Sequence, residues 1–171
     1  MATKLTKTGY GQLELNQVAF RRSGRIEAQC KLADGIDFVE NGMLLAVNNM
    51  NRTVGYAAEG NVFPIALNYT SEHMYDNRAN ALKDFRLEKD SFLPRLGYLG
   101  AGDKYTTNTV EYEGYDNDDA FLAAVGTTVL YAHAGADGYH LVNTEAKGAV
   151  ALAIAATTMP DGQKAVKFQA L

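Results

Sequence analysis

The sequence lacks the features that mark secreted or membrane-spanning chains. Of its 171 residues only Cys30 is a cysteine, so no internal disulfide can form. No apolar run reaches the roughly 20 residues that span a bilayer. The first residues, MATKLTKTGYGQL, contain no apolar segment of the kind found in secretory signals. We therefore expect a protein that is not secreted, is made in a reducing cytoplasm and does not contact a membrane.

The chain also lacks the surplus of positive charge that is typical of nucleic-acid-binding domains. It has 16 lysines and arginines against 20 aspartates and glutamates, giving a net charge of −4 and a pI near 5.3. We therefore expect no direct contact with nucleic acid. With 47% hydrophobic and 21% charged residues, the composition is that of an ordinary globular protein.

Catalytic and cofactor-binding signatures are missing as well. The sequence has no HExxH, no paired CxxC and no GxSxG, and the glycines of the stretch GYLGAGDKY lack the spacing of a phosphate-binding loop. Asp116, Asp118 and Asp119 form an acidic cluster, but it lacks the glycine and the distal glutamate of a calcium loop. A helix N-terminus explains two of these aspartates. We expect no cofactor, no metal and no enzymatic activity.

Histidines leave one alternative of another class open. His133, Tyr139 and His140 flank an Asp137-Gly138 turn, and two histidines on opposite arms of a hairpin could supply two metal ligands. A zinc site needs three or four ligands, and the remaining histidine, His73, is distant in the sequence. The pattern favours ordinary strand and turn histidines. The alternative is a small β-barrel enzyme or ligand-binding protein that uses the His133/His140 region.

The residues that are present predict an all-β chain. Sixteen glycines and a turn signal about every ten residues separate short apolar runs, which is typical of a barrel or sandwich. We expect the runs at 13–20 and 26–32 to form a hairpin, with Cys30 on the inner face of the second strand. Pro64 predicts that the run at 62–67 is an edge strand or a bulge. Further strands are expected at 36–39, 43–47, 54–58, 106–113, 127–133 and 139–142. Residues 92–99 are expected to be either irregular or a strand. The predicted fold is a compact β-barrel or sandwich with one or two short helices.

Two segments carry helix signals. Asn117 can cap a helix whose first turn contains two aspartates and whose C-terminal glycine is Gly126. Residues 71–90 are rich in charge and free of Gly and Pro, and Ser71 can cap a helix there. The alternative for this stretch, at about 70–91, is a long loop that reaches over a neighbouring subunit.

The last residues, 148–171, predict a closing β-hairpin. Branched and aromatic residues recur with a period of two, at Val150, Leu152, Ile154, Val166 and Phe168. Between the two strands, Pro160 and Gly162 suit a type I turn closed by a left-handed residue. We expect Ile154 and Val166 to be buried.

The N-terminal part suggests surfaces for association. Residues 1–10 are rich in threonine and lysine, so we expect a flexible arm ahead of a single mainly-β domain at 11–171. A cluster of three arginines follows the first predicted strand, and interfaces are enriched in arginine. The candidate contacts with an acidic neighbouring subunit are Lys4, Lys7, Arg21, Arg22 and Arg25.

The C-terminal half, VLYAHAGADGYHLVN followed by KGAVALAIAATTMPDGQKAVKFQAL, resembles the ends of small all-β virion proteins of tailed bacteriophages. These are the decoration or cement proteins of phage heads. The resemblance implies a non-enzymatic structural protein that is assembled in the host cytoplasm and binds in many copies to the capsid surface. Its partners would be the major capsid protein or other virion subunits, with self-association into a symmetric oligomer. A tail or neck component is the alternative within this class.

Overall fold

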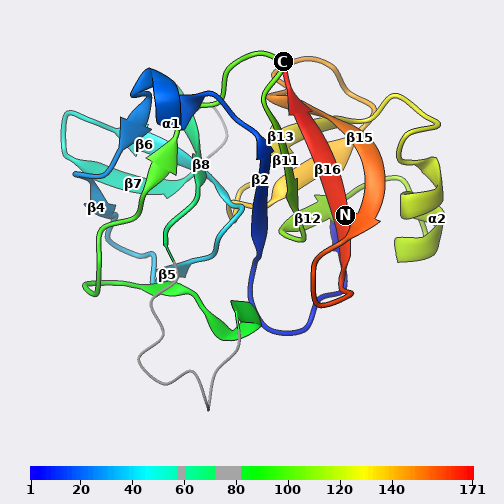
Figure 1. The fold of residues 1–171 in the computed structure, drawn as a ribbon, viewed down its shortest axis with the longest axis horizontal. Helices are drawn as coiled ribbons and strands as arrows, with labels where there is room; N and C mark the ends of the chain where they lie inside the picture. The colour runs from blue at the N-terminus through cyan, green and yellow to red at the C-terminus, as the bar shows by residue number, and fades with distance from the viewer. Residues whose placement is uncertain (58–60, 72–81) are drawn as a thin grey trace.

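The computed structural model describes residues 1–57, 61–71 and 82–171. Most regular structure in these residues is strand (Figure 1). The eight-stranded sheet contains, in spatial order, β1 (Thr3–Lys4), β12 (Val110–Tyr112), β14 (His140–Asn143), β13 (Tyr131–Ala134), β15 (Ala151–Thr158), β16 (Lys164–Ala170), β11 (Lys104–Thr107) and β2 (Leu13–Gln17). The six-stranded sheet contains β3 (Ile26–Glu27), β10 (Leu96–Gly97), β8 (Ile65–Asn68), β6 (Leu44–Asn48), β7 (Thr53–Tyr56) and β4 (Lys31–Leu32). A small third sheet pairs β5 (Phe38–Val39) with β9 (Leu87–Glu88).

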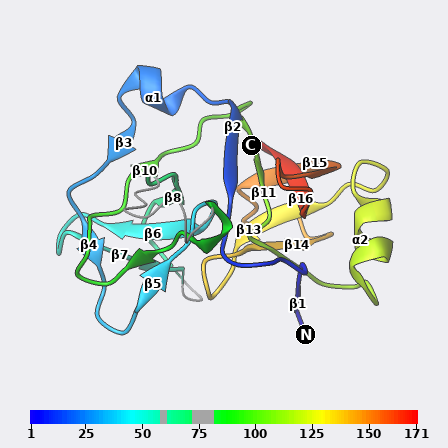
Figure 2. The same cartoon turned by 60° about the horizontal axis from the view of Figure 1, so that its bottom comes forward.

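These sheets are sandwich-like and do not close into a barrel, which confirms the all-β prediction in its sandwich form. Figures 1 and 2 show the six-stranded sheet and helix α1 (Phe20–Ser23) on one side of the molecule. Strands β13 to β16 and helix α2 (Asp118–Ala124) lie on the other side, and β2 stands between the two groups.

The two large sheets share part of one apolar core. The core cluster beneath the eight-stranded sheet contains the buried aromatic residues Tyr105 and Phe168, and it also takes in Leu44 and Leu67 from the six-stranded sheet. A second buried cluster, which includes Cys30, combines residues of the six-stranded sheet with Val39 and Leu87 of the small sheet and with Tyr139. The sheets therefore contact each other through apolar side chains as well as through the connecting chain.

The terminal hairpin forms as the sequence predicts, between β15 and β16. Its turn is closed by a hydrogen bond from the Gly162 amide to the Met159 carbonyl (2.8 Å), and Gly162 has a φ of +86°. Val166 is fully buried, as predicted. Ile154 is only half-buried, so that part of the prediction is wrong. Ala151 and Ala153 are buried instead, and Ala153 lies opposite the buried Phe168 on the neighbouring strand.

The predicted N-terminal hairpin is also wrong. β2 pairs with β11, whereas residues 26–32 break into two short strands of the other sheet, β3 against β10 and β4 against β7. Partners more than 20 residues away along the chain decide this pairing. Cys30 lies between the two short strands and is buried, as expected for a small apolar side chain.

The strand after Pro64 lies at the centre of its sheet, not at the edge. β8 begins at Ile65 and pairs with β10 on one side and β6 on the other. The proline stands just before the strand, where its missing N–H costs no ladder hydrogen bond. The predicted strand at 106–113 is likewise two strands, β11 and β12, which do not pair with each other.

Helix α2 forms as predicted. The other predicted helix, at 71–90, lies in part outside the described residues. Asn117 caps α2 by accepting a hydrogen bond from the Ala120 amide (2.9 Å), and Gly126 has a φ of +83°. In the predicted helix or loop at 71–90, residues 72–81 lie outside the described residues. The described remainder forms a 3-10 turn at Leu82–Asp84 and the strand β9.

The N-terminal residues pack against the domain, contrary to the expected arm. β1 pairs antiparallel with β12, and the next residue, Leu5, is 1% exposed within the main core cluster. The Leu5 amide donates to the Val110 carbonyl (2.9 Å) and the Thr6 amide donates to the Asp118 carboxylate (3.1 Å). Strand pairing, a buried leucine and polar contacts with the domain together order a segment whose composition suggests flexibility.

Candidate functional site

Lys7 occupies a buried charge cluster that sequence reasoning did not predict. Its Nζ forms an ion pair with Glu40, and the two side chains are 12% and 5% exposed. Burial lowers the pKa of Lys7, although the Glu40 carboxylate opposes this shift. The Tyr139 hydroxyl donates to Glu40 Oε1 (3.3 Å). Lys7 is therefore paired within its own chain, and its contact with a neighbouring subunit stays a prediction.

Lys4 also has partners within the chain. It forms an ion pair with Asp137 at the β13–β14 turn, and its Nζ lies 4.3 Å from the centroid of the Tyr139 ring. Its side chain remains 54% exposed. Beside it, burial raises the pKa of Glu111 to about 7, a shift that Asp137 increases and Lys4 opposes. These contacts tie the N-terminal segment to the hairpin at 131–143.

The two histidines of that hairpin face opposite sides of the sheet. His140 pairs with Ala134, one residue past the pair of His133 with Leu141, so the two histidines alternate in direction. His140 is fully buried, with Nε2 2.9 Å from the Tyr105 hydroxyl and Nδ1 3.2 Å from the Thr109 carbonyl oxygen. Burial lowers the pKa of His140 to about 3. This geometry prevents His133 and His140 from binding one ligand together.

His140 forms part of the core. The Thr109 carbonyl can only accept, so Nδ1 carries the proton and Nε2 accepts from the Tyr105 hydroxyl. The imidazole also stacks on the Phe168 ring, with a centroid distance of 4.6 Å. Its buried polar atoms are thus satisfied by the protein. The other sequence candidate of this kind, His73, lies outside the described residues.

The two aspartates in the first turn of α2 have structural partners. Asp118 accepts from the Tyr112 hydroxyl (2.8 Å), and its hydrogen bonds with Thr6 and Tyr112 lower its pKa despite partial burial. Asp119 forms an exposed ion pair with Lys164. Both lie in the first turn of α2, as the helix explanation requires. Within residues 1–57, 61–71 and 82–171, no three His, Cys, Asp or Glu side chains gather as a metal site.

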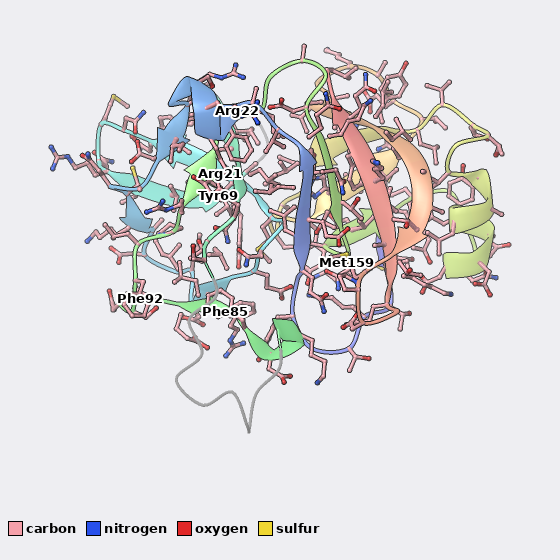
Figure 3. All side chains as sticks on the ribbon, viewed as in Figure 1. Arg21, Arg22, Tyr69, Phe85, Phe92 and Met159 are labelled. Carbon is pink, nitrogen blue, oxygen red and sulfur yellow. The ribbon has the colours of Figure 1, made fainter. Side chains whose placement is uncertain are left out.

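The three clustered arginines are exposed, within α1 and just after it. Among the described residues, no ion pair involves Arg21, Arg22 or Arg25, although Arg25 Nε donates to the Ser23 hydroxyl (3.2 Å). Arg21 and Arg22 belong to α1 and are labelled in Figure 3. A groove of about 490 Å³ lies between α1 and β2, lined by Leu15, Asn16, Gln17, Val18, Arg21 and Arg22. The structure thus joins two of the predicted arginines to an edge strand.

A second groove lies on the outer side of the terminal hairpin, where sequence reasoning expected core. It has a volume of about 260 Å³ and is lined by residues 126–130 and 152–154. Leu152 and Ile154 are half-buried, and Val129 beside them is 63% exposed. The period of two correctly placed Leu152 and Ile154 on one face. It carries no signal for which face turns inward.

Comparisons with known proteins add no assignment to these surfaces. None of the described helices is long and apolar enough to cross a membrane. No protein-family model matches the chain, and searches of curated proteins and of solved structures also find no match.

Proposed function

We propose that this chain is a non-enzymatic structural protein of a phage virion, which binds in many copies to the capsid surface as a decoration protein. Its partner in this role is the major capsid protein. The observation that carries the proposal is the outward apolar groove formed by Val129, Leu152 and Ile154. Clustered apolar side chains at a surface are typical of protein–protein contacts.

The chemistry of this groove suits docking better than catalysis. Its walls are aliphatic side chains, threonines and a glycine, and none of the residues that line it is charged. Burial of apolar surface contributes roughly 25 cal/mol per Å², so a groove of this size gives a weak contact on its own. Repetition over a capsid lattice strengthens such a contact, because each further site is engaged at high effective concentration.

The test is co-sedimentation of the purified protein with assembled capsid particles. We expect Ile154→Asp to remain folded, because Ile154 is half-exposed, and to lose binding, because a charge would enter the docked groove. Thr157→Asp is the matched control, since Thr157 is an exposed residue of the same strand outside the groove. Full binding by a folded Ile154→Asp protein would remove this groove from the proposal.

Electron micrographs decide between the head and the alternative position in the tail or neck. Particles prepared with and without the protein should differ in density over the capsid shell. A difference confined to the tail or neck would replace the decoration role with a structural role there.

A further inference from the structure

We propose that a second copy of this chain pairs antiparallel with β2, so that the eight-stranded sheets of two copies join edge to edge about a twofold axis. This inference rests on the proposed function in so far as both assign the chain a role in association. It adds the surface and the partner for self-association, which the outward groove at β15 does not provide.

β2 is the most extensive open edge in the described fold. It is the last strand of its sheet and pairs only with β11. β2 has five residues, whereas the other edge strands of the two large sheets, β1, β3 and β4, have two each. Within the described residues, no further backbone hydrogen bond involves residues 13–17. Such an edge presents a free row of N–H and C=O groups to another strand.

The groove beside β2 provides the apolar surface that a strand of a second copy would cover. Leu15 and Val18 are half-buried in it, whereas Asn16 and Gln17 are exposed. A strand laid along β2 would complete its hydrogen bonds and bury the exposed parts of Leu15 and Val18. This is the geometry of strand addition at a sheet edge, in which main-chain hydrogen bonds and side-chain contacts act together.

The charges along this edge are complementary when the strand faces a copy of itself. Antiparallel pairing centred on Leu15 brings the Val18 end of one strand to the Leu13 end of the other. In this register Asn16 lies opposite the partner's Glu14. Arg22 lines the groove at the Val18 end of the strand, which is the end that the partner's Glu14 approaches. A twofold axis repeats this Arg–Glu contact, as is usual for isologous interfaces. No ion pair within the described part of the chain competes for Arg22 or Glu14.

Sedimentation equilibrium of the purified full chain tests for the dimer, at loading concentrations from about 1 µM to 1 mM. We expect a monomer–dimer equilibrium within this range. Gln17→Lys should raise the dissociation constant at least about tenfold, because it sets a charge against the partner's Leu13 in the paired edge. Gln29→Lys is the matched control, because Gln29 is exposed on the connection between β3 and β4. A thermal melt of each variant establishes that it is folded.

A charge exchange tests the predicted register. Glu14→Arg and Arg22→Glu should each weaken the dimer, because each places like charges together across the junction. The double variant should recover most of the lost affinity. A folding defect in either single variant would not be rescued in this way. A wild-type chain that stays monomeric up to 1 mM, or a dimer unaffected by Gln17→Lys, would overturn the proposal.

The two proposals fail separately. A monomeric wild-type chain that still co-sediments with capsid particles would remove the β2 dimer and leave the decoration role intact. A β2-dependent dimer that does not bind particles would remove the decoration role and leave the dimer.

Discussion

His140 is a buried histidine whose neutral form is built into the core. Its ring accepts from the Tyr105 hydroxyl, donates to the Thr109 carbonyl and stacks on Phe168. The hydrogen bond accepted at Nε2 requires the uncharged imidazole with its proton on Nδ1. No solvent reaches the ring, because the side chain is fully buried. In the sequence His140 is a candidate metal ligand, whereas in the structure it packs in the core.

This environment predicts acid sensitivity with a defined sign. The pKa of His140 is about 3 in the folded protein, whereas it returns to about 6.5 on unfolding. The unfolded state therefore binds more protons between these values, and the stability contributed by neutral His140 is present above pH 6.5 and lost towards pH 3. We expect urea midpoints of the wild type to fall more steeply from pH 7 to pH 4 than those of His140→Gln. Parallel midpoint curves for the two proteins would contradict this prediction.

The sequence predicts a flexible arm at residues 1–10, whereas in the structure this segment packs against the domain. β1 adds to the edge of the eight-stranded sheet beside β12, and Leu5 follows it into the core. The ion pairs of Lys4 and Lys7 hold the same segment against Asp137 and Glu40. Since these contacts link residues more than 30 positions apart, we expect the segment to contribute to the stability of the fold.

Leu5→Ala should therefore destabilise the protein by about 2–5 kcal/mol, the usual cost of emptying a fully buried leucine site. Chemical denaturation monitored by circular dichroism measures this change. Lys4→Ala is the control within the same segment, because the Lys4 side chain is 54% exposed and exposed ion pairs contribute little. A midpoint for Leu5→Ala equal to that of the wild type would show that the segment is a dispensable arm after all.

For the whole molecule, the shared core decides whether the two sheets unfold together. Leu44 and Leu67 belong to the six-stranded sheet yet pack in the cluster beneath the eight-stranded sheet. Phe20 adds to this connection, since a Cβ on Gly97 of β10 would come within 2.4 Å of its ring. The glycine lets the ring pack directly on the strand.

We expect a single cooperative unfolding transition. Cys30 is 2% exposed in the second cluster, so its reaction with a thiol reagent reports the six-stranded sheet. Tyrosine near-ultraviolet circular dichroism also reports the other cluster, through its buried Tyr105 and Tyr112. The two signals should give the same denaturant midpoint, as two-state unfolding requires. Separate midpoints would show that the two sheets are independent folding units.

The sequence by itself determined the features that depend on neighbouring residues. The Asn117 cap and Gly126 placed α2, and Pro160 and Gly162 placed the turn of the terminal hairpin. The alternation of apolar residues also predicted an all-β chain. These signals are reliable because caps and turns are set by the local backbone and by hydrogen bonds over a few residues.

Only the tertiary structure decided which strands pair and which faces turn inward. A period of two separates Ile154 from Ala153, but it does not say which of them meets the Phe168 ring. The partner of β2 lies about 90 residues away in β11, and Leu5 gains its burial from strands across the chain. Such choices follow from the total apolar volume that distant segments bring together, so no local pattern contains them.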